Sequence, residues 1–260
     1  MSMGKIWSNL ILNRQQPKVV TIIGGGGKTS LMYYLLSVLK AAGYTAVGTT
    51  TTKLSSHEFS GNYFARISSI EAGYKAVQEA RGIQDHVTLV SGEDTRFPGK
   101  MIGIPGEWID ELATLCRDVV FVVEGDGSAG KPLKGHLANE PVIPNSSSLV
   151  IPVIGIDSVG VGLNLQSVHR PERICELTGA LPESLVTTEI ITQMLFHSQG
   201  YLHNCPDHSV IVPFINKVES VIQHQQAQKL AWQILASKHS QVGGVIVGSL
   251  MQEEGLWLQV

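Results

Sequence analysis

The fold of this chain is decided by residues 19–30, which read VVTIIGGGGKTS. The first five residues are all β-branched, which favours a buried strand. Four glycines interrupt this strand, and from Lys28 onward the apolar residues Leu31, Leu35 and Leu39 recur at the spacing of one helix face. The stretch therefore predicts a strand, a glycine turn and a helix in direct succession.

A glycine turn in this setting is typical of a phosphate-binding P-loop, because backbone N–H groups and the start of the helix attract phosphate oxygens. Glycines leave room for that approach. Lys28 would reach the β- and γ-phosphates as a catalytic residue, and the Thr29 hydroxyl would ligate Mg²⁺. We therefore expect ATP or GTP, with Mg²⁺, to contact the six backbone N–H groups of residues 24–29 and the side chains that follow. The predicted binding residues are Gly24, Gly25, Gly26, Gly27, Lys28, Thr29 and Ser30.

The match to G-x-x-x-x-G-K-[ST] has one departure, since Ile22 stands where that spacing has its first glycine. The segment instead resembles the deviant P-loops of cell-division, arsenite-pump and metal-insertion NTPases. Those usually carry an extra lysine just before the glycines, and Ile23 occupies that place. A lysine that reaches across a dimer is therefore not expected at this position. The alternative is a glycine turn that binds no ligand.

P-loop proteins need a carboxylate at the end of a neighbouring hydrophobic strand. Residues 119–123 (VVFVV) form the most hydrophobic strand expected, and Glu124 and Asp126 follow it. We predict both as catalytic residues, with Asp126 holding the metal together with Thr29. A solvated turn after a strand is the competing interpretation.

A base-reading loop is predicted after the expected strand 210–215. The residues Asn216, Lys217 and Glu219 resemble the N-K-x-D motif that reads guanine. Glu219 is one methylene longer than aspartate, which weakens the case for guanine and leaves ATP and GTP both open. The second expected strand ends in the segment that contains Thr50, Thr51 and Lys53. At that edge of the sheet they would sense the γ-phosphate or complete the Mg²⁺ shell. The alternative is that they are ordinary strand residues.

Strands and helices alternate along the rest of the chain, except in residues 54–106, where the pattern is less regular. Pro152 indicates an edge strand or a kink in the strand 149–154, and Trp108, Leu112 and Leu115 are expected to face inward from the helix 107–116. A single domain spanning 1–260 is expected, with an α/β fold: a doubly wound, mostly parallel sheet of the P-loop NTPase type, flanked by helices in three αβα layers. The other expected helices are 70–81 and 220–237, and the other expected strands are 44–47, 87–90 and 244–247.

Composition narrows the class of partner. Hydrophobic residues make up 43% of the chain and the net charge is −3, so no broad basic surface is expected to bind nucleic acid. The apolar N-terminal run is too short and interrupted for a membrane span. The cysteines Cys116, Cys175 and Cys205 show no metal-binding spacing, which favours reduced thiols in the cytoplasm.

A family resemblance rests on four segments in order: GGGGKTSLMYYL, TTTTKL, EGDGSAGKPLKGHLANEPVIP and VHRPE. They resemble the accessory proteins of selenium-dependent molybdenum hydroxylases, the YqeC type, also called selenium cofactor biosynthesis proteins. The resemblance runs from about Lys18 to Glu219, and residues 124–144 are its most specific part. Gly125 departs from the alanine of this pattern and Glu219 from its aspartate. The resemblance implies that the chain acts on a molybdenum hydroxylase or its cofactor.

The loop 128–136 is rich in glycine and lysine, and we expect Ser128, Lys131, Lys134 and His136 to cradle an anion beside the γ-phosphate. A mobile basic loop is the alternative. His169 and Arg170 precede Pro171, which suits the first turn of a helix. They either form the entry to that helix or supply charge to the transition state.

The leading functional hypothesis is a factor that binds and hydrolyses a nucleoside triphosphate during hydroxylase maturation. A small-molecule kinase with its acceptor on the loop 131–136 is the second hypothesis. A nucleotide-gated binding module without catalysis is the third.

Overall fold

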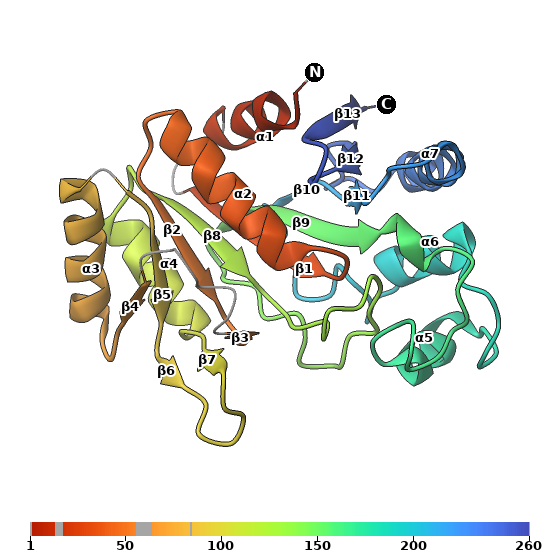
Figure 1. Ribbon diagram of the computed structural model, residues 1–260, viewed down its shortest axis with the longest axis horizontal. Helices are drawn as coiled ribbons and strands as arrows, with labels where there is room; N and C mark the ends of the chain where they lie inside the picture. Colours follow the sequence, from red (N-terminus) through yellow and green to blue (C-terminus); the bar gives the residue numbers. More distant parts are fainter. Residues whose placement is uncertain (1, 14–17, 56–63, 84, 260) are drawn as a thin grey trace.

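The computed structural model describes residues 2–13, 18–55, 64–83 and 85–259. Figure 1 shows a central sheet with helices packed against it. The helices are α1 (Met3–Leu12), α2 (Lys28–Ala41), α3 (Ile70–Gly82), α4 (Gly106–Leu115), α5 (Pro171–Thr178), α6 (Thr188–Phe196) and α7 (Val221–Ala236), with a 3-10 turn η2 (Ile156–Ser158). The strands are β1 (Lys18–Gly24), β2 (Ala46–Thr50), β3 (Lys53–Ser55), β4 (Phe64–Arg66), β5 (Val87–Val90), β6 (Gly92–Glu93), β7 (Lys100–Ile102), β8 (Val120–Glu124), β9 (Ser147–Gly155), β10 (Val210–Ile211), β11 (Phe214–Asn216), β12 (Val245–Ser249) and β13 (Glu254–Leu258).

Within the described residues, ten strands form the large sheet in the order β13-β12-β11-β9-β1-β8-β2-β5-β4, with β10 also beside β9. Its pairings are parallel, except that β13 runs antiparallel to β12. The strand β1 is therefore central, between β8 and β9. Parallel strands end at one edge of a sheet, so the loops after these three strands meet there.

Alternation along the strands explains the three layers. Val20 and Ile22 of β1 pack with α1 and α2 on one face, whereas Val19 packs with α3 and α4 on the other. At the far end of the sheet, Ile215 and Val245 pack with α5, α6 and α7. Because successive strand residues point to opposite faces, a sheet with buried strands needs helices on both sides. The predicted three-layer α/β fold is confirmed (Figure 1).

Two prolines account for the largest difference from the predicted strands. The strand expected at 210–215 is divided into β10 and β11, with Val212 and Pro213 between them. The prediction that Pro152 marks an edge strand is wrong, because β9 lies in the interior between β1 and β11. Val150 pairs with Ile211 and Val153 with Phe214, so Pro152 lies opposite the gap between β10 and β11. A missing N–H costs no ladder bond where the neighbouring strand is itself interrupted.

Smaller differences concern the surface. Leu115 was expected to face inward from α4, but it is 54% exposed, and Ile109 is buried on that helix instead. The antiparallel β13 was not predicted.

A second, three-stranded sheet (order β3-β7-β6) occupies part of the stretch that showed no regular pattern. We call it the small sheet. Its hairpin β6–β7 projects beyond the large sheet (Figure 1).

The small sheet is anchored to the core by one face. Leu54 of β3 and Met101 of β7 are buried in the same cluster as the inner residues of α2.

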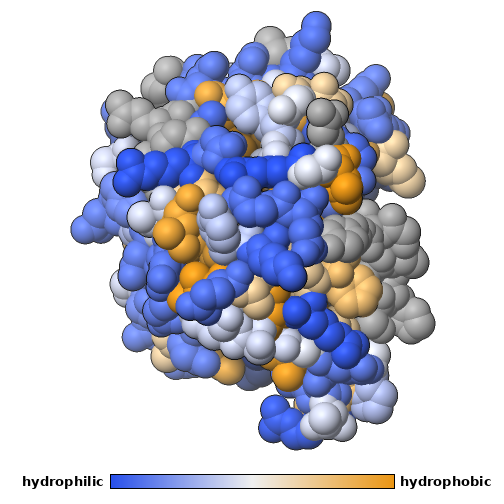
Figure 2. Space-filling view, turned by 90° about the vertical axis from the view of Figure 1, so that its left-hand side faces the viewer, coloured by the Kyte–Doolittle hydropathy of each residue, from blue (hydrophilic) through white to orange (hydrophobic). Residues whose placement is uncertain are grey.

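The molecular surface on the α3 side is mainly hydrophilic, with separate apolar patches (Figure 2). Among the described residues, none of the helices combines the length and the apolar character that spanning a membrane requires.

Candidate functional site

The glycine loop, Gly24–Gly27, joins the carboxyl end of β1 to the first turn of α2. Gly26 and Gly27 have φ values of 92° and 122°, in the region that favours glycine. An added Cβ on Gly26 would stand 2.3 Å from the backbone nitrogen of Gly155. The glycines therefore let the loop pack directly on the end of β9 at Gly24 and Gly26, on the backbone of residues 131–133 at Gly25, and on the Asn216 side chain at Gly27.

The amides of this loop do not all face one ligand. Gly24 N–H donates to the Asp126 carboxylate, Gly25 N–H donates to the carbonyl of Val153, and Gly26 N–H donates to the carbonyl of Lys131. The expectation that all six amides of residues 24–29 contact phosphate is therefore wrong for these three. The N–H groups of the first turn of α2 have no partner within the helix, as in any helix N-terminus.

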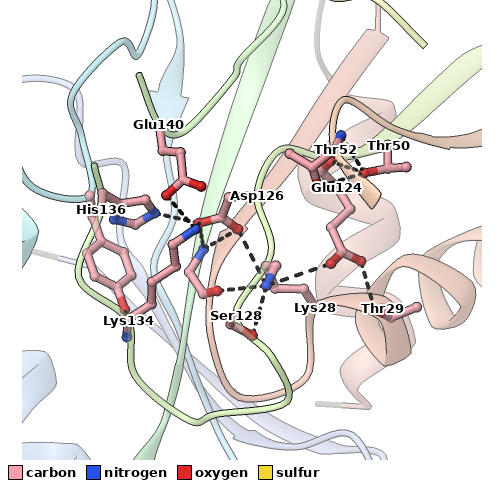
Figure 3. A network of polar contacts seen from close by, with 12 residues as sticks. Lys28, Thr29, Thr50, Thr52, Glu124, Asp126, Ser128, Lys134, His136 and Glu140 are labelled. Carbon is pink, nitrogen blue, oxygen red and sulfur yellow. Dashed lines mark hydrogen bonds and ion pairs between the residues drawn. The ribbon is translucent and has the colours of Figure 1, made fainter. Parts of the chain in front are cut away.

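Lys28 lies at the centre of the site. Its ammonium donates to the Gly24 carbonyl at 2.7 Å and to the Ser128 hydroxyl at 3.2 Å. It also lies 3.7 Å from Glu124 and 3.4 Å from Asp126. Figure 3 shows Lys28 between the two carboxylates. A lysine held this way is pre-positioned at the loop, although it is only 4% exposed.

Glu124 ends β8 and meets the first turn of α2. The Thr29 hydroxyl donates to the Glu124 carboxylate at 2.8 Å (Figure 3). The parallel register places Glu124 opposite Ile22 of β1, and this brings its side chain to the mouth of the glycine loop. A hydroxyl and a carboxylate at this separation are hard oxygen donors of the kind that Mg²⁺ prefers.

Asp126, which we expected beside the metal with Thr29, lies deeper. It is completely buried and accepts from Gly24 N–H. Its second oxygen lies 3.4 Å from the Lys134 ammonium and 2.5 Å from His136 Nε2. The Thr29 hydroxyl is hydrogen-bonded to Glu124, so Glu124 is the carboxylate adjacent to the predicted Mg²⁺ position.

Electrostatics keep Asp126 ionised. Burial alone would raise the pKa of Asp126, but the charge of Lys28, the hydrogen bond from His136 and the charge of Lys134 outweigh burial and lower it. Burial lowers the pKa of His136 despite its carboxylate neighbour. His136 is therefore neutral at pH 7, and its Nε2–H donates to Asp126.

The anion cradle expected on the loop 128–136 is mostly internal. Lys134 and His136 are fully buried, and Lys134 lies 2.8 Å from Glu140. The Lys131 ammonium donates to the carbonyl of Gln166. Ser128 alone of the four expected residues lines the cavity described below. This loop therefore packs on the glycine loop more than it presents a surface to a ligand.

His169 and Arg170 do not line that cavity either. Arg170 lies 2.5 Å from Glu140, and the His169 carbonyl accepts from Gly135 N–H. Arg170 is the residue before α5, which confirms the helix entry predicted from Pro171.

Thr50 and Thr51 use their hydroxyls within the protein. Thr50 donates to the carbonyl of Glu124 at 2.9 Å, and Thr51 donates to the carbonyl of Val142 at 2.8 Å. These bonds join the end of β2 to the end of β8 and to the loop at Val142. Lys53, in contrast, lines the cavity.

Two adjoining cavities open at the start of α2. One of about 340 Å³ adjoins the glycine loop and the small sheet, and we call it the phosphate-side cavity. The other, of about 490 Å³, adjoins the end of β11, and we call it the base-side cavity. Gly27, Ser30 and Lys217 line both cavities, so the two cavities adjoin along these residues.

The residues expected to read a base surround the base-side cavity. Asn216 donates to the Gly26 carbonyl at 2.8 Å and accepts from Leu250 N–H at 3.1 Å. Lys217 lies 2.7 Å from Asp157, and Glu219 accepts from the Ser249 hydroxyl at 2.8 Å. Asn216 therefore braces the glycine loop against the end of β12, whereas Lys217 and Glu219 form the cavity wall.

Sequence reasoning missed Lys100, which lines the phosphate-side cavity from β7. No motif marks it, because it comes from a short hairpin in the stretch without periodicity. Tyr201 was missed for a similar reason. Its hydroxyl accepts from Lys134 N–H, and its ring meets His136 edge-on at 4.6 Å.

The fold and the site define an α/β protein with a lysine-bearing glycine loop between a central strand and a helix, faced by the carboxylate of the adjacent strand. Comparison with known proteins identifies the family. The model of the family described as "YqeC protein" matches residues 20–172. The "Uncharacterized protein YqeC" of Escherichia coli (strain K12) is 32% identical over 212 residues, which cover 78% of this chain and 77% of that protein. The chain belongs to the YqeC family.

Proposed function

We propose that this protein binds a nucleoside triphosphate with Mg²⁺ in the two adjoining cavities and hydrolyses it. The triphosphate lies in the phosphate-side cavity, and the base and ribose lie in the base-side cavity. The observation that carries the proposal is the contact between Thr29 and Glu124 at the N-terminus of α2, directly beside Lys28. It supplies two hard oxygen ligands, a cation and unpaired helix amides at one point.

Each group has a role in this proposal. When the nucleotide binds, Lys28 gives up part of its contact with the two carboxylates and contacts the β- and γ-phosphates. Thr29 and Glu124 hold Mg²⁺, directly or through water, and the bound metal supplies charge neutralisation for the leaving phosphate oxygens. Asp126 holds Gly24 and Lys28 in place, since it is buried and touches both.

The small-molecule kinase hypothesis has less support from the structure than it had from the sequence alone. Its acceptor was expected on the loop 131–136, yet Lys134 and His136 are fully buried there. The biological step follows from the resemblance of residues 124–144 to accessory proteins of selenium-dependent molybdenum hydroxylases. We propose that hydrolysis drives a step in the maturation of such a hydroxylase in the cytoplasm.

The test is calorimetric titration of MgATP and MgGTP into wild type, Lys28→Ala and the exposed control Lys75→Ala, followed by assay of phosphate release. We expect one site per chain, at least about tenfold weaker binding for Lys28→Ala, and unchanged binding for Lys75→Ala. Because Lys28 also neutralises buried carboxylates, circular dichroism must confirm folding. Thr29→Val provides a second variant that keeps Lys28 and should lose the Mg²⁺ dependence. Wild type that binds neither nucleotide would contradict the proposal, and binding without phosphate release would contradict hydrolysis.

A cellular test addresses the hydroxylase. A selenium-dependent hydroxylase produced without this protein should contain little selenium by elemental analysis, and wild type should restore the selenium content. Restoration by Lys28→Ala to the wild-type level would show that the nucleotide site is not needed for that step.

A further inference from the structure

The small sheet contributes two lysines to the wall of the phosphate-side cavity, which the glycine loop also lines. Lys53 of β3 and Lys100 of β7 both line this cavity. In the antiparallel register, Lys100 pairs with Ser55, which is two residues along β3 from Lys53. Lys53 and Lys100 are therefore diagonal neighbours on one face of the small sheet.

This face is held at the cavity by the core. Met101 points the other way and is buried in the core, and Leu54 belongs to the same core cluster and also lines the cavity. Gly103, just after β7, donates its N–H to the carbonyl of Thr52, and Ile104 N–H donates to the carbonyl of Thr50. The small sheet is thereby joined to the end of β2, close to Glu124.

The lysines of the cavity differ in their partners. Lys28 lies between Glu124 and Asp126, and Lys217 is paired with Asp157. Lys53 is paired with Asp94 and stacks over the ring of Phe97. Lys100 makes no ion pair with any residue that the structure describes. Among the residues that the structure describes, Lys100 is therefore the lysine of the cavity wall that has no anionic partner.

We propose that Lys100, with Lys53, binds a phosphate-like dianion in the phosphate-side cavity, which Lys28 also lines. The proposal rests on the proposed nucleotide site, because it concerns the same cavity. The dianion is either the γ-phosphate of the bound nucleotide or a separate oxyanion next to a bound diphosphate. Asp94 competes with this dianion for Lys53, so the Lys53–Asp94 pair opposes binding.

Three titrations are compared. MgNTP and MgNDP are each titrated into the free protein, and inorganic phosphate is titrated into the protein loaded with MgNDP. The nucleotide carries the base that wild type prefers. Lys100→Gln is compared with Lys75→Gln, which removes the same charge from the exposed face of α3. If the dianion is the γ-phosphate, Lys100→Gln weakens MgNTP binding about tenfold and leaves MgNDP binding unchanged, because one charged hydrogen bond is lost. If it is a separate oxyanion, Lys100→Gln weakens only the binding of inorganic phosphate. Lys75→Gln changes none of the three.

Asp94→Asn should change the dianion affinity in the opposite direction. It frees Lys53 while its side-chain oxygen still accepts from Arg96 N–H, so dianion affinity should rise about twofold to fivefold. The proposal is overturned if Lys100→Gln leaves all three affinities unchanged, or weakens MgNTP and MgNDP equally. Absence of any nucleotide binding by wild type would instead contradict the proposed function, and this proposal with it.

Discussion

The backbone N–H of Gly24 donates to both carboxylate oxygens of Asp126 at 3.0 Å. This contact joins the end of β1 to the loop that follows β8, and Lys28, Lys134 and His136 surround the same carboxylate. The geometry gives different positions and roles to the two acidic residues that were predicted from the sequence, Glu124 and Asp126. Asp126 is a buried anchor for the glycine loop, whereas Glu124 faces Thr29 at the mouth of the cavity (Figure 3).

Asp126→Asn should destabilise the protein by about 3–5 kcal/mol, because it removes the charge that offsets buried cations. The measurement is the free energy of unfolding from urea titration at pH 7. Asp207→Asn, on the exposed surface, is the matched control and should change stability by less than about 0.5 kcal/mol. A loss below 1 kcal/mol for Asp126→Asn would show that the cluster is not the anchor described.

Glu124→Gln should leave the fold intact but remove most of the effect of Mg²⁺ on nucleotide affinity. Glutamine keeps the shape and a hydrogen bond to Thr29, yet it is a poor Mg²⁺ ligand. We expect the ratio of affinities with and without Mg²⁺ to fall at least about tenfold, measured by titration in Mg²⁺ and in excess chelator. An unchanged ratio would mean that another group holds the metal.

Gly25→Ala should destabilise the protein by about 1–3 kcal/mol, as overpacking does. A Cβ on Gly25 would lie 2.6 Å from the carbonyl oxygen of Lys131, a backbone atom that cannot swing away. Gly127→Ala is the control within the same site, since nothing lies within 4 Å of its added Cβ. It should be neutral or more stable by about 0.4–1 kcal/mol, because alanine restricts the unfolded chain. Thermal unfolding of both variants tests the contrast.

His136 should contribute a pH dependence to stability. Its pKa is lowered in the folded protein by burial, so below the unfolded pKa of about 6.5 the unfolded chain takes up a proton that the folded chain does not. Stability from this group is therefore fully present above about pH 6.5 and falls as the pH drops, by at most about 1.4 kcal/mol per pH unit.

His136→Asn should flatten this part of the profile between pH 7 and pH 5.5, relative to wild type. His86 and His169 also have pKa values lowered by burial, and they contribute equally to both proteins. The difference between the two profiles therefore isolates His136. Parallel profiles would show that the pKa of His136 does not differ between the folded and the unfolded protein.

The sequence by itself determined the local elements and the fold class. Residues 19–30 contain the strand, the turn and the helix because β-branching, glycine and apolar periodicity act within a few residues. The alternation of strands and helices then leaves few ways to bury both faces of a sheet. The family resemblance rested on the same contiguous segments, and the match over residues 20–172 confirms it.

Only the tertiary structure decided which groups meet. Glu124 and Asp126 are two residues apart, but the register of β8 against β1 and the end of the strand at Glu124 place one at Thr29 and the other under Gly24. Lys100 reaches the cavity through a hairpin that pairs with β3, and Pro152 is accommodated in an interior strand by a gap in its neighbour. These outcomes depend on contacts between residues far apart in the chain, which local propensity does not encode.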